Sequence, residues 1–276
     1  MGIFMDYQML VLDIDGTLTT SKKEISPETL DAIMKIQQLG YHVVLASGRP
    51  TAGIVPVAKQ LQLGKYGNYI LAFNGAKIIN CKTQQVIYQK ILPRNIIPIL
   101  WKEAIENGVG LISYENDSVI TGTKIDSYME LESKINGIPI RTVDNFPEYI
   151  DFDVNKCLMT GEPTILAELE RKLKQRFNGL INIFRSEPYF LELMPQNVDK
   201  AHSLSKLLVS LGLSAEQMIC CGDGFNDISM IEYAGLGVAM ENAQDLVKQA
   251  SDYITSSNDN NGILQVIQQF FLNKNS

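Results

Sequence analysis

The stretch Met9-Leu10-Val11-Leu12-Asp13-Ile14-Asp15-Gly16-Thr17 passes from an apolar segment directly into two carboxylates. An apolar run of this length predicts a buried β-strand, with the acidic residues at its C-terminal end. Open α/β sheets bind their ligands at that end of the strands. Because side chains alternate along a strand, Asp13 and Asp15 should point the same way. Two like charges held close together favour a bound cation, and oxygen ligands favour a hard ion such as Mg²⁺.

A second acidic segment, Gly222-Asp223-Gly224-Phe225-Asn226-Asp227, follows the apolar run 218–221. It predicts a second buried strand that ends in carboxylates. One metal ion could join the two strand ends, since Asp223 and Asp227 would lie at the same edge of the sheet as Asp13. The sequence offers no cluster of Cys and His residues for zinc.

The segments around these acidic stretches alternate between strand and helix patterns. Ser26-Pro27-Glu28 is typical of a helix start, with Ser26 as the N-cap and proline at the first helical position. The βαβαβ order predicts a parallel, doubly wound sheet. Expected strands are 9–12, 42–46, 69–73, 217–221, 237–240 and 253–254, and expected helices are 27–39, 51–61, 199–211, 226–233, a helix from 243 and 262–271.

Residues from about 90 to 190 show a different pattern, in which helices and short strands mix and turn signals are frequent. Expected helices are 95–107, 125–134 and 162–176, and expected strands are 109–114, 117–121, 155–160, 180–185 and 189–193. We therefore predict an α/β fold, in which residues 1–84 and 191–276 form a doubly wound, mostly parallel sheet core. Residues 85–190 are expected to form an inserted α+β cap domain that sets substrate specificity.

Composition limits the partners of this protein. The net charge of −7 and the pI near 5.0 argue against nucleic-acid binding, which uses basic surfaces. No apolar run approaches the roughly 20 residues that span a bilayer, so we expect no membrane segment. The four cysteines include no CxxC motif, which favours free thiols and a cytoplasmic location. The sequence leaves the oligomeric state open.

The polar loops that follow the expected core strands suggest a chemistry. Ser47-Gly48 precedes a helix, so its hydroxyl and backbone N–H groups could hold an anion. Asn226 can donate from its amide, and Lys200 offers a mobile cation at the start of a helix. Carboxylates, a hard metal, an anion-binding loop and a lysine together indicate phosphoryl transfer. An aspartate can act as the nucleophile, and a carboxylate two residues later as general acid and base.

Other site types find less support. The sequence has neither the GxxxxGK[ST] nor the GxGxxG nucleotide fingerprint, and Ser47 lacks the GxSxG context of a nucleophilic serine. His42 begins a strand and is expected to be structural. His202 and Arg49 lie near expected site residues, and whether either contacts a ligand stays open.

These motifs resemble those of the haloacid dehalogenase-like (HAD) phosphohydrolases, in particular the Cof-type group with a large α+β cap. The four motifs of that family are matched, in order, by Asp13–Thr17, Ser47–Arg49, Lys200 and Gly222–Asp227. The resemblance continues in Phe73–Ala76 and Gly237–Ala243, so it spans nearly the whole chain and is weakest inside the cap. One departure is Asp199 before the lysine, where the group commonly has a small residue.

The resemblance implies a role for each matching residue. Asp13 would be the nucleophile, and Asp15 the general acid and base. The implied metal ligands for Mg²⁺ are Asp13, Asp15 (through its main-chain carbonyl), Asp223 and Asp227. The implied phosphate-binding residues are Ile14 (through its backbone), Ser47, Gly48, Lys200 and Asn226.

The implied function is a Mg²⁺-dependent phosphatase that acts through an aspartyl-phosphate on small phosphorylated metabolites, such as sugar phosphates or cofactor phosphates. A phosphosugar mutase or phosphotransferase of the same superfamily is an alternative. A non-catalytic sensor of phosphorylated ligands is a third reading, but such a protein would be expected to have lost part of the acidic set. The cap carries no motif that names the substrate.

Overall fold

The computed structural model describes residues 6–273, and the chain divides into two compact units. The described part of the first, here called the core unit, comprises residues 6–48, 54–88 and 199–273. The second, here called the inserted unit, comprises Arg49–Gly53 and Gln89–Val198. Each unit has its own sheet.

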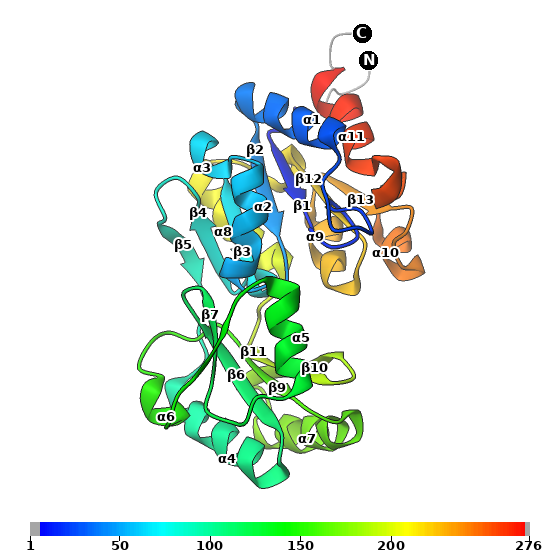
Figure 1. Ribbon diagram of the computed structural model, residues 1–276. Coiled ribbons are helices and arrows are strands. Elements are labelled where there is room, and N and C mark those ends of the chain that lie inside the picture. Colours follow the sequence, from blue (N-terminus) through cyan, green and yellow to red (C-terminus); the bar gives the residue numbers. More distant parts are fainter. Residues whose placement is uncertain (1–5, 274–276) are drawn as a thin grey trace. The chain divides into compact units, whose positions relative to one another are not determined.

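The core unit contains an eight-stranded sheet in the order β14-β13-β12-β1-β2-β3-β4-β5 (Figure 1). The strands are β1 (Met9–Leu12), β2 (His42–Ala46), β3 (Tyr69–Ala72), β4 (Lys77–Asn80), β5 (Val86–Gln89), β12 (Met218–Gly222), β13 (Leu236–Met240) and β14 (Tyr253–Thr255). Neighbours from β14 to β3 pair in parallel, and β4 pairs antiparallel with β3. The predicted, mostly parallel α/β sheet is confirmed.

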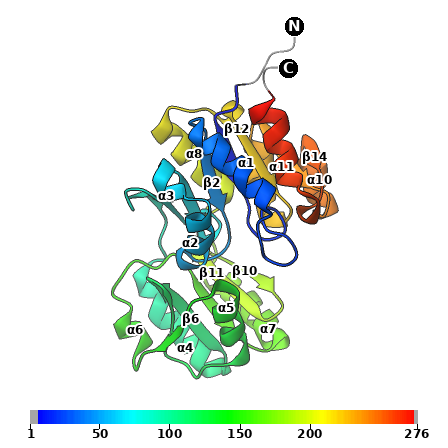
Figure 2. The ribbon, with the colours of Figure 1, turned by 45° about the horizontal axis from the view of Figure 1, so that its top comes forward.

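Burial on both faces explains the continuous apolar run of β1, whose four residues are all fully buried. Met9 and Val11 belong to an apolar cluster with residues of α8 and α9, so these helices cover one face. On the other face α1 and α11 lie side by side (Figures 1 and 2). The helices of this unit are α1 (Pro27–Gln38), α2 (Thr51–Gln60, which begins in the inserted unit), α3 (Leu63–Tyr66), α8 (Lys200–Leu211), α9 (Ile228–Tyr233), α10 (Asp245–Ala250) and α11 (Gly262–Ile267).

The helix starts follow the local sequence. Ser26 caps α1 by accepting a hydrogen bond from the backbone N–H of Thr29, and Pro27 occupies the first helical position, as predicted. The last expected helix ends differently, because α11 passes into a π-helical turn at Gln268–Leu272.

The inserted unit contains a mixed six-stranded sheet in the order β10-β11-β9-β6-β7-β8. Its elements are α4 (Ile97–Asn107), β6 (Gly110–Glu115), β7 (Ser118–Thr121), α5 (Ser127–Asn136), β8 (Ile140–Thr142), α6 (Phe146–Tyr149), β9 (Cys157–Thr160), α7 (Pro163–Arg176), β10 (Ile181–Glu187) and β11 (Phe190–Pro195). Helices α4 and α7 pack against one face of this sheet, and α5 packs against the other (Figure 1). The expected α+β character is confirmed.

Two elements of the inserted unit were not predicted. Strand β8 has three residues, none of them buried, so it shows no alternation of apolar and polar residues. Helix α6 has a single turn, which is too short for a 3.6-residue period. All four cysteines are free thiols. Within residues 6–273, no helix has the length and apolar character needed to cross a membrane.

Candidate active site

Three loops of the core unit leave the sheet at one edge. Strand β1 lies between β2 and β12 and runs parallel to both, so Asp13, Ser47 and Asp223 follow the C-terminal ends of three neighbouring strands. The backbone N–H of Asp13 still donates to the carbonyl of Cys221, over 3.1 Å, which continues the ladder by one residue. The sheet therefore brings together the loops that the sequence predicted to converge.

Lys200 lies at the centre of this edge. It begins α8, whose N-cap is Asp199, and its side chain is fully buried. The ammonium Nζ lies 2.8 Å from Asp13 Oδ1, 2.6 Å from Asp227 Oδ1 and 2.7 Å from the carbonyl oxygen of Ala46. Three acceptors match the three donors of an ammonium group. The sequence reading of Lys200 as a mobile cation is therefore wrong, since burial and these three bonds hold it in place.

The charges of this centre oppose one another. Burial disfavours the charged ammonium of Lys200, but Asp13 and Asp227 outweigh it and raise the lysine pKa above its ordinary value. Burial raises the pKa of Asp13 well above its usual range, Asp227 raises it further, and Lys200 acts in the opposite direction. A cation bound beside Asp13 would favour its ionised form.

Three carboxylates form a possible metal site. Asp13, Asp223 and Asp227 each offer one oxygen atom, and these atoms lie within 4.8 Å of one another. Burial raises the pKa of Asp223 to about 6, although a hydrogen bond from the hydroxyl of Thr17 opposes the shift. Three carboxylates against one lysine leave a charge of −2, which a divalent cation would balance. An all-oxygen donor set suits a hard ion, so these residues fit the metal that the family implies.

The side chain of Asp15 does not belong to this group. Its Oδ1 accepts a hydrogen bond from Lys23 Nζ over 2.8 Å. The chain leaves β1 after Leu12, and Asp15 pairs instead with Thr19 in an isolated bridge. Asp13, Asp223 and Asp227 therefore form the close oxygen group. Asp15, whose implied metal contact is its main-chain carbonyl, still lies near enough for its charge to raise the pKa of Asp223.

Asp227 organises its own loop. Its Oδ2 accepts hydrogen bonds from the backbone N–H groups of Asp223 (3.0 Å) and Gly224 (2.9 Å), while its Oδ1 binds Lys200. The side chain is therefore both a possible metal ligand and the anchor of the 3₁₀ turn Phe225–Asp227. Close packing also requires Gly16, whose φ is +83° and where a Cβ would lie 2.4 Å from Asp223 Oδ2.

Three of the expected phosphate-binding residues, Ser47, Gly48 and Asn226, lie close to Asn74, a residue that was not among the predicted site residues. Asn74 donates its backbone N–H to the carbonyl of Ser47, and its Oδ1 accepts from the side chain of Asn226, both over 3.0 Å. A Cβ on Gly48 would lie 3.1 Å from the same Oδ1. The side chain of Ile14 is fully buried, so only its backbone could contact a ligand. The signal for Asn74 was the Asn-Gly turn, in which asparagine tolerates the observed φ of +53°.

His42, expected to be structural, and the open candidates His202 and Arg49 each contact a neighbouring protein residue. His42 packs against Tyr69, with 6.2 Å between ring centroids, and burial lowers its pKa. The ring of His202 lies edge-on to Tyr88 at 6.0 Å. Arg49 donates to the carbonyl of Gly53 over 3.3 Å, within the inserted unit.

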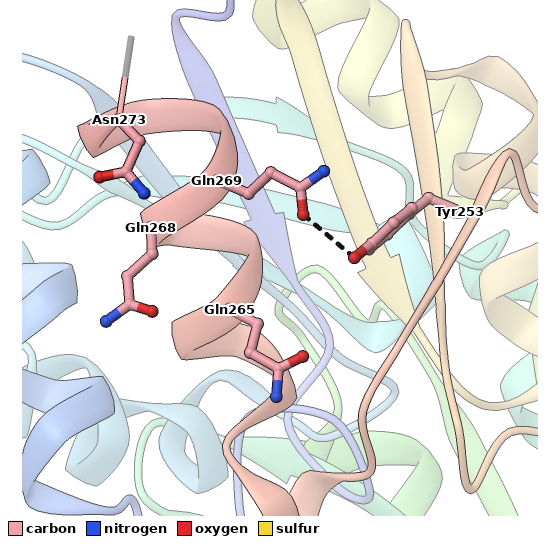
Figure 3. Close-up of a pocket in the computed structure, with 5 residues that line it drawn as sticks. All are labelled: Tyr253, Gln265, Gln268, Gln269 and Asn273. Carbon is pink, nitrogen blue, oxygen red and sulfur yellow. Dashed lines mark hydrogen bonds between the residues drawn. The ribbon is translucent and has the colours of Figure 1, made fainter. Parts of the chain in front are cut away.

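A separate hollow of about 390 Å³ lies between β14 and the last helix of the core unit (Figure 3). It is lined by Tyr253, Gln265, Gln268, Gln269 and Asn273, and the Tyr253 hydroxyl donates to Gln269 Oε1 over 3.1 Å. Its lining holds amides and a phenol but no carboxylate or cation. The candidate active site is therefore the edge with Asp13 and Lys200.

Comparison with known proteins decides the family. The sequence profile of the haloacid dehalogenase-like hydrolases matches residues 10–267, which is most of the chain. The chain belongs to this family. The resemblance that the four motifs suggested is thus confirmed, and the protein is a hydrolase by family.

Solved and curated relatives agree with the HAD fold over almost the full chain. A haloacid dehalogenase-like hydrolase from Bacteroides thetaiotaomicron is 46% identical, with a TM-score of 0.93, over 96% of this chain and 100% of that one. A HAD subclass IIB sugar phosphatase is 26% identical, with a TM-score of 0.80, over 95% of this chain and 98% of that one. The 5-amino-6-(5-phospho-D-ribitylamino)uracil phosphatase of Bacillus subtilis is 29% identical over 268 residues, 97% of each protein.

Proposed function

We propose that this HAD-family hydrolase is a Mg²⁺-dependent phosphatase that acts on small phosphorylated metabolites through an aspartyl-phosphate intermediate. The observation that carries the proposal is the position of Asp13. It follows a buried strand, lies 2.8 Å from the fully buried Lys200, and shares a three-carboxylate group with Asp223 and Asp227. A carboxylate held beside a fixed cation at the edge of a parallel sheet suits nucleophilic attack on phosphorus.

In the first half of the reaction, a carboxylate oxygen of Asp13 forms a bond to phosphorus while the bond to the leaving oxygen breaks. Asp15 donates a proton to that oxygen. In the second half, ionised Asp15 takes a proton from water as the water attacks the aspartyl-phosphate. Inorganic phosphate leaves, and Asp13 and protonated Asp15 are regenerated. Mg²⁺, when bound by Asp13, Asp223, Asp227 and the main-chain carbonyl of Asp15, would neutralise phosphate charge.

The remaining polar groups of the edge act on the phosphoryl oxygens in this proposal. Ser47, Gly48, Asn226 and the backbone of Ile14 would donate hydrogen bonds to them. Lys200, whose three N–H groups are bonded to protein oxygens, would act on the phosphate through its charge. Asn74 fixes the positions of Ser47 and Asn226 relative to each other, because it makes one hydrogen bond with each of them. Lys200 also keeps Asp13 oriented, because its ammonium is bonded on both sides by carboxylates.

The substrate class follows from the size of the core motifs. They bind phosphate and metal but leave few groups to recognise the rest of a substrate, so we propose that residues 85–190 act as a specificity cap. Two relatives have names that state a substrate: one is a sugar phosphatase, and the other a 5-amino-6-(5-phospho-D-ribitylamino)uracil phosphatase. These names support a hydroxylated, small phosphomonoester for this chain. We further propose a cytoplasmic location, where the free thiols would stay reduced.

A phosphate-release screen with Mg²⁺ tests this function. Sugar phosphates, nucleotides and cofactor phosphates are incubated with the wild type, with the chelated enzyme and with Asp13→Asn. The proposal expects inorganic phosphate from at least one small phosphomonoester in the first arm only. Isomerised sugar phosphate without phosphate release would indicate the mutase instead, and release by Asp13→Asn at the wild-type rate would remove Asp13 as nucleophile.

A further inference from the structure

Asp15 differs from Asp13 and Asp227 in its lysine partner. Asp13 and Asp227 are bonded to Lys200, and Asp223 lies in the same oxygen group. The Oδ1 of Asp15 is instead bonded to Lys23 Nζ at 2.8 Å. The site therefore has two lysines with different partners: Lys200 is bonded to Asp13 and Asp227, and Lys23 to Asp15.

Lys23 lies in a tight loop that is closed by two backbone hydrogen bonds. The backbone N–H of Thr20 donates to Glu24, and that of Lys23 donates back to Thr20, over 2.9 and 2.8 Å. Lys23 itself has a φ of +63°, which a side-chain-bearing residue rarely adopts. Such a conformation persists where the surrounding contacts determine it.

Those contacts come from the segment after β14. The side chain of Asn258 donates to the carbonyl of Thr19 over 2.9 Å, and the backbone N–H of Ser21 donates to Asp259 over 2.8 Å. Both anchors lie more than two hundred residues along the chain from the loop. These two hydrogen bonds fix the loop from which Lys23 contacts the Asp15 carboxylate, although the Lys23 side chain itself is 64% exposed.

We propose that Lys23 is a positioning residue that holds Asp15 where it can protonate the leaving-group oxygen. An exposed ion pair contributes little to the free energy of unfolding. The effect of Lys23 is therefore to orient the Asp15 carboxylate and not to stabilise the fold. A general acid must lie within hydrogen-bond reach of the oxygen that it protonates. Lys23 binds Oδ1, and the proposal assigns the proton transfer to Oδ2, while the ammonium keeps its own protons throughout. This inference rests on the proposed function, because Lys23 can position a general acid only if Asp15 acts as one in that reaction.

The chain provides a matched control. Lys22 precedes Lys23, is exposed in the same loop and makes no ion pair within the part of the chain that the structure describes. Lys23→Met and Lys22→Met therefore remove the same charge one residue apart. Lys23→Arg keeps the charge, and Lys23→Gly removes it while relieving the left-handed backbone, which glycine adopts freely.

The experiment compares two substrates that need a general acid to different degrees. An alkyl phosphate has a poor leaving group, whereas p-nitrophenyl phosphate has a good one that departs without a proton. For Lys23→Met and Lys23→Gly, we expect kcat/KM for the alkyl phosphate to fall about five- to tenfold, a part of the roughly hundredfold that a general acid supplies. The aryl phosphate should change less than about twofold by the same reasoning, since its leaving group needs no acid. Lys23→Arg should restore most of the alkyl rate, and Lys22→Met should leave both rates unchanged.

A role in folding or in metal binding alone would lower both rates together or raise the Mg²⁺ concentration for half-maximal activity. Either result overturns the positioning role, and so does a Lys23→Met enzyme that matches Lys22→Met. A wild type that releases phosphate from neither substrate refutes the proposed function, and this inference with it. A wild type that hydrolyses both, with Lys23→Met unaffected, refutes only this inference.

Discussion

Replacing Lys200 by methionine tests the electrostatic centre of the site. Methionine keeps the length and volume of the side chain but removes the ammonium, which is bonded to Asp13, Asp227 and the carbonyl of Ala46. Breaking a buried ion pair by removing one partner costs about 3–5 kcal/mol, because the remaining charge stays buried. We expect a loss of this size in the free energy of unfolding of the metal-free protein at pH 8. Mg²⁺ should reduce it, since a cation would balance the same carboxylates.

The pH dependence of this loss has a definite sign. Burial and Asp227 already raise the pKa of Asp13 in the folded protein, and removing Lys200 takes away the group that opposes the rise. A carboxyl with a raised folded pKa binds its proton more tightly than in the unfolded chain, so it destabilises the fold as pH increases through that pKa. The loss in Lys200→Met should therefore be smaller at pH 5 than at pH 8.

Urea unfolding measures the free energies, with EDTA or Mg²⁺ present and at both pH values. Lys206→Met, an exposed position on the same helix, is the control and should stay within about 0.5 kcal/mol of the wild type. Loss of the positive charge beside Asp13 and the phosphate should also lower kcat/KM by about ten- to a hundredfold, which corresponds to about 1.5–3 kcal/mol. A Lys200→Met protein that unfolds with the wild type in EDTA at pH 8 would refute the reasoning.

Four further predictions concern the candidate active site and the inserted unit. Asp13→Asn should lower phosphate release by about 10³-fold or more, while urea unfolding without metal shows no loss of stability, because it removes a charge that burial disfavours. EDTA should abolish activity and Mg²⁺ restore it, whereas Ca²⁺, which takes more and longer bonds, should oppose it. The Mg²⁺ concentration for half-maximal activity should rise as pH falls through about 6, because Asp223 becomes protonated there and can no longer bind metal. A half-saturating concentration that stays constant between pH 8 and pH 5 would contradict this. In the inserted unit, Lys156→Ala should lower the free energy of urea unfolding by about 3–5 kcal/mol, because it leaves Glu192 buried without the ammonium that lies 3.1 Å away. The double variant Lys156→Met with Glu192→Leu should be nearly neutral, since it removes both charges. Equal losses in the two variants would contradict the ion-pair account.

Much of the fold was predictable because its signals are local. Apolar runs such as Met9–Leu12 and the helix start at Ser26-Pro27 predict an element from neighbouring residues alone, and the structure confirms both. The order of these elements then limits the topology to a parallel, doubly wound sheet. Strand β8 was not predicted because it is short and unburied, and so has no apolar pattern of its own. It is a strand because it pairs with β7.

The sequence by itself determined which residues could meet, because strand ends in a parallel sheet share one edge. Only the tertiary structure decided how they meet. Lys200 lies 187 residues from Asp13, and its burial between two carboxylates depends on where α8 packs against the sheet. Asp15 is bonded to Lys23, and the loop that carries Lys23 is held by Asn258, more than two hundred residues further along the chain. Long-range packing sets such contacts, and no local pattern in the sequence records them.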